Sequence, residues 1–424
     1  MSVPEISGDE SEQQPPHRGH WRRPRDYLVA VLLLVAALLG WWLIFLGSDI
    51  RATTSATAPV AQTELTAPAT VPARLRQIWQ ASSPQTPAPV ATPPSVVTGD
   101  NHTVTGRDPL TGAARWRYTR SNLSLCEVSS GWSKVLALYR RNGYCSEVTS
   151  LDANTGKRGA QRNGDAAGNT RLVDGGTYVT TTGKTLLDTW RSDLVQTMEY
   201  GAVEDFNQPG KQPRQGCTYG SVAARADLVG VIERCPADED RKQQPGDRVT
   251  VYQAAPPSAD TPVVTFSLVL PGKHARIVAV NDDYTAVALP GSLLVYANHT
   301  KKLAAKYPIT VPAKDFRGDP PGRVVPTASG SDALYWFTGS NTMALSANDF
   351  HPLFSVAHTL GSGTEFAGGL LLPVQGAIEV LDPRSGVQRS RIVVHRGGYS
   401  GHIAMASIGP VVLEQRGATL VALR

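Results

Sequence analysis

The four cysteines are the residues whose type and spacing most directly indicate chemistry. Cys126 and Cys145 are 19 residues apart, Cys217 and Cys235 are 18 apart, and each pair encloses an apolar, strand-like run. We predict disulfides between Cys126 and Cys145 and between Cys217 and Cys235, each joining the start of one strand to the region just beyond its antiparallel neighbour. Loops of this length contribute about 3 kcal/mol in the chain-entropy model. The other two connectivities stay open, and a zinc site is the alternative, although the sequence has no Cys-x-x-Cys.

The sequence contains no motif for nucleophilic, phosphate-binding or metal-dependent catalysis. It has no G-x-S-x-G elbow, no P-loop and no H-E-x-x-H. Residues 281–283 (Asn-Asp-Asp) could meet a cation, but their place between two apolar runs favours an ordinary β-turn. Histidines spaced seven residues apart match no metal motif: His351 with His358, and His395 with His402. We therefore predict no catalytic residue, no bound metal and no cofactor, and we expect that the protein is not an enzyme.

One segment near the N-terminus is long and apolar enough to cross a membrane. Residues 27–47 number 21 and carry no charge, and at about 1.5 Å per residue they span a bilayer core. A secretory signal peptide has a shorter apolar run of about 7–15 residues, so we expect an uncleaved anchor. The sequence Ala56-Thr57-Ala58 resembles a cleavage site but lies well past the apolar run. Cleavage there stays the alternative.

The charges on either side of this segment predict its direction. Residues 17–25 carry four arginines and no acid, whereas Asp49 and Arg51 nearly cancel on the other side. The positive-inside rule then places the N-terminus in the cytoplasm and the rest of the chain outside the plasma membrane. The net charge of +5 is too mild for a dedicated nucleic-acid binder. We predict a disordered cytoplasmic tail over residues 1–26 and a transmembrane helix over residues 27–47. A stalk rich in Pro, Ala and Thr follows over residues 48–73, and a folded domain over residues 74–424.

A recurring turn organises residues 74–424. Its pattern is Asp-x-x-Thr/Ser-Gly between two strands, in which the aspartate accepts hydrogen bonds from the amides ahead and the glycine supplies a positive φ. Weaker copies occupy residues 185–200, 249–266, 293–307 and 343–356, and a truncated copy ends the sequence. The three clear copies begin and end at Asp108 and Gly112, Asp152 and Gly156, and Asp382 and Gly386.

A period of roughly 40 residues with about four strands per unit is typical of a β-propeller. The turn at Asp108 followed by Arg115-Trp116 resembles the PQQ-like β-propeller repeat, which occurs in quinoprotein dehydrogenases and in the outer-membrane assembly lipoprotein BamB. The resemblance covers about residues 74–424 and implies an all-β propeller of four-stranded antiparallel blades. In quinoprotein dehydrogenases PQQ lies over a disulfide of adjacent cysteines, which this sequence lacks. The resemblance therefore implies the fold and not the redox site.

The two ends of the folded region are expected to complete one blade. Residues 403–424 supply up to three strands, and residues 75–82 resemble an outer strand in which Trp79 is placed as Trp116 is. Pairing the two ends closes a ring, which removes free sheet edges. Seven complete repeats plus this composite blade predict eight blades. Seven is the alternative, because the copy around residues 171–200 is short. We expect Trp79 and Trp116 to brace outer strands rather than to stack on a cofactor.

These features favour a non-enzymatic scaffold that presents rigid rim loops to other proteins. We expect a membrane-anchored extracytoplasmic propeller that binds envelope proteins, and no nucleic acid, in the assembly or maintenance of a bacterial envelope. Residues 201–216 and 314–322 are candidate binding loops. One alternative is a binding or sensing module for a small ligand or a cell-wall polymer in the central channel. A less favoured alternative is a PQQ-type oxidoreductase.

Overall fold

The computed structural model describes residues 23–60, 63–164, 170–203, 210–214, 216–235, 246–318 and 322–424. It divides into two units, Met1–Ala52 and Thr53–Arg424. Residues 1–22 of the tail predicted over residues 1–26 lie outside the described residues.

The first unit contains one long apolar helix, α1 (Pro24–Leu46), followed by the short helix α2 (Asp49–Ala52). Pro24 stands in the first turn, where its missing N–H costs nothing, and Gly47 follows the last helical residue. No side chain of α1 is buried, and its most apolar window has a mean hydropathy of 2.8. The helix is therefore long and apolar enough to cross a membrane.

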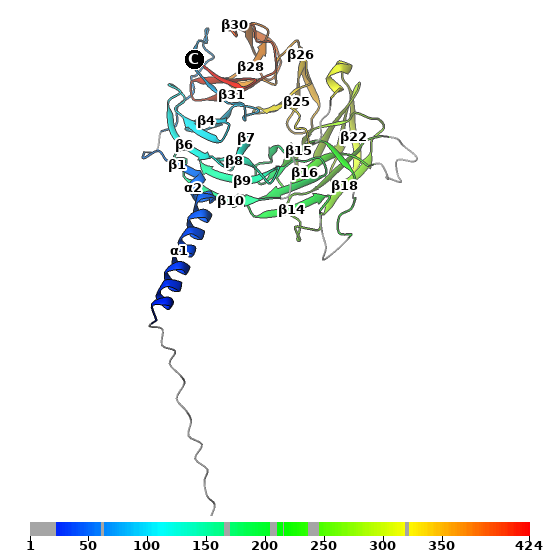
Figure 1. Cartoon of the computed structure of the whole chain (residues 1–424). Helices are drawn as coiled ribbons and strands as arrows, with labels where there is room; N and C mark the ends of the chain where they lie inside the picture. The colour runs from blue at the N-terminus through cyan, green and yellow to red at the C-terminus, as the bar shows by residue number, and fades with distance from the viewer. Residues whose placement is uncertain are drawn as a thin grey trace, which may run out of the picture. The chain divides into compact units, whose positions relative to one another are not determined.

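The second unit is a ring of eight antiparallel sheets, which are the eight predicted blades (Figure 1). The first strand of each blade lies innermost, and neighbouring first strands contact one another, as β15 and β19 do. Blades 1 to 4 comprise β3 (Val90–Thr92), β4 (Ser95–Asp100), β5 (Thr103–Arg107) and β6 (Ala114–Arg120); β7 (Ser124–Gly131), β8 (Lys134–Arg141), β9 (Tyr144–Asp152) and β10 (Arg158–Asn163); β11 (Leu172–Asp174), β12 (Val179–Thr181), β13 (Leu186–Trp190) and β14 (Gln196–Gly201); and β15 (Thr218–Arg225), β16 (Leu228–Arg234), β17 (Arg248–Gln253) and β18 (Val264–Val269).

The remaining four blades complete the ring. The red strand β31 lies beside the cyan strands of blade 1 in Figure 1, and β3 contacts β31. Blades 5 to 8 comprise β19 (Arg276–Val280), β20 (Tyr284–Leu289), β21 (Ser292–Ala297) and β22 (Lys302–Pro308); β23 (Thr327–Ser329), β24 (Ala333–Phe337), β25 (Asn341–Ser346) and β26 (Pro352–Ala357); β27 (Thr364–Phe366), β28 (Gly369–Val374), β29 (Ala377–Leu381) and β30 (Gln388–Val393); and β31 (Ile403–Ile408), β32 (Val411–Arg416), β33 (Thr419–Leu423) and β2 (Gln77–Ser82).

Blade 8 is the composite predicted from the chain ends. Strand β2 pairs with β33 from Gln77 opposite Leu423 to Ser82 opposite Thr419. The amides of Arg76 and Arg424 extend this ladder by exchanging hydrogen bonds of 2.7 and 2.9 Å. The prediction of eight blades closed by terminal strands is therefore confirmed.

The structure differs from the expected stalk over residues 48–73. Strand β1 (Thr53–Ala56) adds to β6 as a fifth strand of blade 1, with Thr53 opposite Arg120. Further along, the amide of Ala58 donates to the carbonyl oxygen of Thr155 at 2.9 Å. A composition too polar to form a core can still bond to existing strand edges and turns, and that is how these residues become ordered. We refer to residues 53–60 and 63–76 as the N-terminal arm.

One connection between blades crosses the inside of the ring. After the short helix η2 (Ala313–Phe316), the chain reaches blade 4, where Val324 forms a parallel bridge with Val222. The amide of Val222 donates to the carbonyl oxygen of Arg323 at 2.9 Å, and the Thr182 hydroxyl donates to that of Gly322 at 2.8 Å. The inner strand β15 of blade 4 and the residue that follows β12 in blade 3 thereby contact the segment that leads into blade 6.

Candidate functional site

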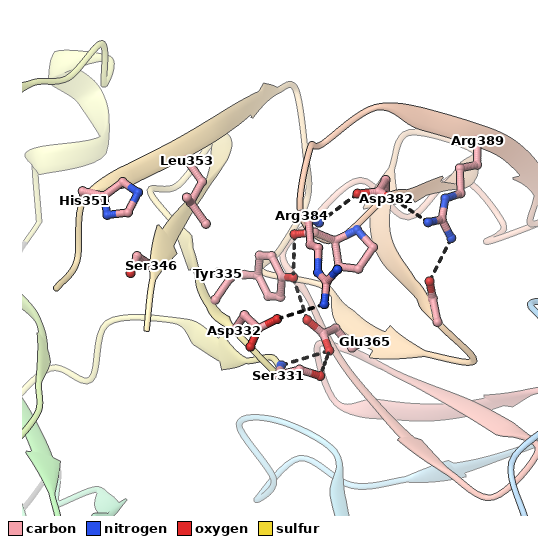
Figure 2. Close-up of a pocket in the computed structure, with 13 residues that line it drawn as sticks. Ser331, Asp332, Tyr335, Ser346, His351, Leu353, Glu365, Asp382, Arg384 and Arg389 are labelled. Atoms are coloured by element: carbon pink, nitrogen blue, oxygen red, sulfur yellow. Dashed lines mark hydrogen bonds and ion pairs between the residues drawn. The ribbon is translucent and has the colours of Figure 1, made fainter. Parts of the chain in front are cut away.

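The principal candidate site is a groove between blades 6 and 7, with a volume of about 510 Å³ (Figure 2). It forms where the turns of both blades meet the outer strands β26 and β30. We call it the blade 6–7 groove, and it is lined by Ser331, Asp332, Ala333, Tyr335, Ser346, His351, Leu353, Glu365, Gly368, Asp382, Pro383, Arg384 and Arg389.

Glu365, on β27, holds the base of the groove together. Its Oε1 accepts a hydrogen bond from the Tyr335 hydroxyl at 2.7 Å. Its Oε2 accepts from the backbone amide and the hydroxyl of Ser331, at 3.0 and 2.8 Å. Burial, and then the bond to the Glu365 carboxylate, raise the pKa of Tyr335 well above its usual value. Tyr335 therefore stays protonated and donates at neutral pH, and blade 7 is fastened to blade 6.

Two arginines from blade 7 form the charged side of the groove. Arg384 reaches across to Asp332 of blade 6 at 3.7 Å, and the two side chains are 84% and 72% exposed. Arg389 pairs with Asp382 and donates to the carbonyl oxygen of Gly368 at 2.9 Å. A long, exposed ion pair such as Arg384–Asp332 contributes little stability. Arg384 can therefore exchange its partner at small cost.

The opposite side of the groove is less charged. His351 lines the groove, and its Nδ1 is hydrogen-bonded to the Asp349 carboxylate at 2.6 Å. Leu353 of β26 is 39% exposed, although it is a large apolar residue. Figure 2 shows Leu353 and His351 on one side of Tyr335, with Arg384 and Arg389 on the other. The groove thus combines an exposed apolar side chain with exchangeable charges, and the buried Tyr335 lies beneath them.

This arrangement suits recognition of a polypeptide. The Glu365 and Asp382 carboxylates accept hydrogen bonds from neighbouring donors, so they orient the groove rather than present a free base. Protein interfaces likewise use arginine side chains together with apolar contacts and a polar rim. Within the described residues, no group of three or more His, Cys, Asp or Glu side chains is placed to hold a metal ion.

The predicted repeat turns lie at three junctions between blades. Asp108, Asp152 and Asp382 each accept hydrogen bonds from the residues two and three positions ahead, as the pattern requires. The amide of Ser385, and then the side chain of Arg389, hold the pKa of Asp382 well below its usual range. Only the Asp382 turn contributes to the groove. The other two pack against Trp79 and Trp116 of the preceding blades.

The structure contains both expected cysteine pairs. Cys126 on β7 joins Cys145 on β9, and Cys217, just before β15, joins Cys235, just after β16. The second bridge lies beside a buried carboxylate, Glu233, which accepts hydrogen bonds from Tyr200, Thr250 and Arg214. The disulfides therefore brace blades 2 and 4, and they stand apart from the blade 6–7 groove.

The two candidate loops are partly described. In residues 201–216, the Gln212 side chain accepts from the amide of Gly201 at 3.0 Å, and Arg214 reaches Glu233 at 2.9 Å. In residues 314–322, the Asp315 carboxylate accepts from Thr338 and Ser340 at 2.8 and 2.7 Å. These described parts are held against the blades. Residues 204–209, 215 and 319–321 lie outside the described residues.

A second hollow lies among the inner strands of blades 3 to 6. Its volume is about 390 Å³, and Val324 and Val325 of the crossing connection contribute to its wall. Its lining mixes apolar and polar residues, and Asp174 and Arg225 are among the polar ones. Burial raises the pKa of Asp174, against the lowering effect of the Gly176 amide and Arg225.

Sequence reasoning found one groove residue, Asp382, through the repeat turn. It missed Glu365, Tyr335 and Ser331, because these residues belong to no recurring motif and meet only when blade 6 packs against blade 7. The segment around Glu365, Gly-Ser-Gly-Thr-Glu-Phe, reads as a turn and a short strand and carries no signal of a site.

The fold defines the class: the described residues form an eight-bladed β-propeller that follows one N-terminal apolar helix. This chain is similar in structure to quinohemoprotein alcohol dehydrogenase from Pseudomonas putida. The match covers 82% of this chain and 76% of the dehydrogenase, with 11% identity and a TM-score of 0.51. Sqt1 from Saccharomyces cerevisiae is similar to 85% of the chain over 99% of its own, with 9% identity and a TM-score of 0.50. BamB from Moraxella catarrhalis matches 82% of the chain over 99% of its own, with 13% identity and a TM-score of 0.49.

These likenesses concern the fold alone, because every identity is low. No protein-family model matches the sequence, and no curated protein matches it. The function must therefore be argued from the site.

Proposed function

We propose that this protein is a membrane-anchored, non-enzymatic scaffold that binds a protein partner outside the plasma membrane, in the assembly or maintenance of a bacterial cell envelope. The apolar helix α1 and the two disulfides support an anchored domain in an oxidising compartment. The four arginines in residues 17–25 favour a cytoplasmic N-terminus.

The blade 6–7 groove carries this proposal. It is built on rigid strands, so its shape is fixed before a partner arrives, which lowers the entropic cost of binding. Leu353, which is 39% exposed, offers an apolar contact, and Arg384 offers a charge whose present partner is 3.7 Å away. A partner side chain can replace Asp332 as the ion-pair partner of Arg384 while an apolar neighbour covers Leu353.

In-cell photo-cross-linking of the full-length chain tests the proposal. A photoreactive residue replaces Leu353 in one strain and Leu303 in another, because Leu303 is a 48% exposed leucine on the outer strand of blade 5. We expect one stoichiometric protein adduct from position 353 and none from position 303. Equal labelling at both positions, or no protein adduct at all, would contradict the scaffold. Ligand binding in the hollow between blades 3 and 6 would then be the better account.

A further inference from the structure

The outer edge of β30 lacks the features that block several other outer edges of the ring. Strand β6 is covered by β1. The amide of Glu199 on β14 donates to the carbonyl oxygen of Ala259 at 2.8 Å, so the next blade occupies that edge. Strand β22 ends in Pro308 and β26 begins with Pro352, and proline on an edge discourages further pairing. Strand β30 ends its sheet and contains no proline, as do β2, β10 and β18, and β30 alone among these four contributes a residue, Arg389, to the blade 6–7 groove.

The register shows which backbone groups of β30 point outward. The amide of Val394 donates to the carbonyl oxygen of Gly376 at 3.1 Å, on the inner side of the strand. Hydrogen-bonded and non-hydrogen-bonded pairs alternate along an antiparallel ladder. Ile392, opposite Ile378, therefore bonds inward, and Val393, opposite Ala377, turns its N–H and C=O outward. Arg391 does the same, so β30 presents a short row of free donors and acceptors.

Blade 5 supports this assignment. Its outer strand β22 has a bulge at the same place as β30. In blade 5 the last pair before the bulge is Val295–Ala305, and in blade 7 it is Val380–Ser390. Pro308 and Val393 each stand three residues beyond that pair, so they occupy equivalent positions. The amide of Ile309 next to Pro308 bonds to Gly291, as that of Val394 bonds to Gly376. Proline lacks an N–H, so it fits a position whose N–H points outward.

The side chains along β30 combine exposed aliphatic groups with positive charge. Val387 and Val393 are 63% and 66% exposed. Arg389 and Arg391 are 51% and 53% exposed, and Arg391 lies 3.6 Å from its partner, Glu379. Arg389 also lines the blade 6–7 groove, so the edge continues one side of that groove. Another copy of the same arginine-bearing edge would meet like charge, which disfavours self-pairing.

Blade 1 shows that this ring accepts a fifth strand. There β1 pairs antiparallel with β6 over four residues, and the four strands inside it have the same consecutive order as in blades 2 to 7. Main-chain bonds supply affinity in such strand addition, and alternate side chains supply specificity.

We propose that the edge of β30 receives a fifth antiparallel strand from the protein partner, an extended segment that alternates acidic and aliphatic residues. This inference rests on the proposed scaffold function and names the chemistry of its partner. Arg391 and Val393 lie on the same face of β30 because they are two residues apart. The acidic side chains of the added strand lie on that face and meet Arg391, and its aliphatic side chains lie on the other face. The same segment can continue into the blade 6–7 groove beside Arg384.

The test uses the full-length protein in detergent micelles and a fluorescent, end-blocked peptide of four Glu-Val units, with a Lys-Val peptide as its charge control. We expect the acidic peptide to bind more tightly than the basic one, and more weakly as salt rises. Val393→Pro removes one outward N–H and should weaken binding about tenfold or more. Ala357→Pro is the matched control, because Ala357 stands three residues beyond the pair Ala344–Phe354 of blade 6, as Val393 stands three residues beyond the pair Val380–Ser390.

The charge-reversal variant Arg391→Glu keeps the test decisive if Val393→Pro does not fold. This variant should bind the acidic peptide more weakly and the basic peptide more tightly than the wild type does. Equal binding of the two peptides, or equal loss in both proline variants, overturns the proposal. Self-association of the protein that disappears in Val393→Pro also overturns it, in favour of a second copy. If the cellular adduct at position 353 persists in Val393→Pro, the scaffold stands and only the strand-addition proposal fails.

Discussion

The indole of Trp116 in blade 1 lies against the backbone of Gly156 in blade 2. A Cβ placed on Gly156 would lie 2.6 Å from Trp116 Cδ2, and Trp116 Nε1 donates to the carbonyl oxygen of Ala153 at 3.1 Å. The outer strand of one blade thus docks on the repeat turn of the next. Trp79 and Gly112 repeat the contact between blades 8 and 1, as do Phe354 and Gly386 between blades 6 and 7.

This contact predicts that Gly156→Ala is more harmful than an ordinary glycine substitution. Gly156 has φ +72°, and Gly376 has φ +69° but no atom within 4 Å of its would-be Cβ. Both alanines bear a backbone cost of about 1–2 kcal/mol. Only Gly156→Ala adds an overpacking cost of about 1–3 kcal/mol against Trp116. Thermal and denaturant unfolding of both variants measures the difference, and equal destabilisation would show that the Trp116 contact is not tight.

The junction between blades 5 and 6 reverses this arrangement. The amide of Phe350 donates to Ser346 at 3.0 Å, which is the bond that Gly156 makes to Asp152, yet Phe350 keeps a positive φ of 57°. Its ring is buried, and Ala305 of blade 5, at the place of Trp116, packs against the same cluster.

We therefore expect Phe350→Gly to lower the free energy of unfolding by about 3–5 kcal/mol. Adding Ala305→Trp should restore part of the lost stability, because the new tryptophan can pack on the glycine at position 350 as Trp116 packs on Gly156. Lys301→Gly is the control, because Lys301 has φ 60° in the equivalent turn of blade 5. Its change in unfolding free energy measures only the effect of placing glycine at a positive φ. Chemical denaturation of the four proteins checks this, and no recovery in the double variant would refute the equivalence.

The Cys217–Cys235 bridge is expected to stabilise blade 4. It closes a loop of 18 residues, which in the chain-entropy model contributes about 3 kcal/mol. Replacing both cysteines by alanine should lower the unfolding free energy by about that amount, and reducing agent should then affect only Cys126–Cys145. Thiol labelling followed by mass spectrometry checks the pairing. Labelling of any cysteine in the unreduced protein would contradict it.

The N-terminal arm predicts protection of the sequence Ala56-Thr57-Ala58. Ala56 pairs with Arg117, and Ala58 is buried, with its amide bonded to Thr155. A protease needs extended, accessible backbone, so elastase should spare this site in the folded protein. Ala58→Arg cannot keep the buried contact and should make the site cleavable, releasing the propeller from membranes. Ala52→Arg, a half-buried alanine outside the propeller unit, is the control. Equal cleavage in the two variants would contradict the protective role.

His402 predicts a loss of stability in mild acid. Burial, and then the neighbouring charge of Arg323, lower its pKa from the usual 6.5, and its ring stacks on Phe337 at 5.2 Å. In the unfolded chain the imidazole takes up a proton at a higher pH than in the folded protein. Its contribution to stability is therefore present above about pH 6.5 and falls as the pH drops toward the folded pKa. Thermal unfolding between pH 7.5 and 5.5 should fall less steeply in His402→Phe than in the wild type. Identical slopes would refute the contribution of His402.

The sequence alone determined the elements that depend on local pattern. The apolar run of α1, the turn residues Asp108 and Gly112, the strand period and the matching ends of blade 8 are each readable from neighbouring residues, because turn chemistry and hydrophobic alternation act over a few positions. The predicted propeller, its eight blades and its closure follow from these, and the structure confirms them.

Only the tertiary structure decided where residues from separate blades meet. Glu365 and Tyr335 are 30 positions apart and form one site only through the packing of blades 6 and 7. The N-terminal arm has the composition of a stalk but bonds to strand edges that exist only after the ring has closed. The outward direction of Val393 depends on the register of its sheet. Such long-range contacts are set by the closure of the ring, and no short stretch of sequence encodes them.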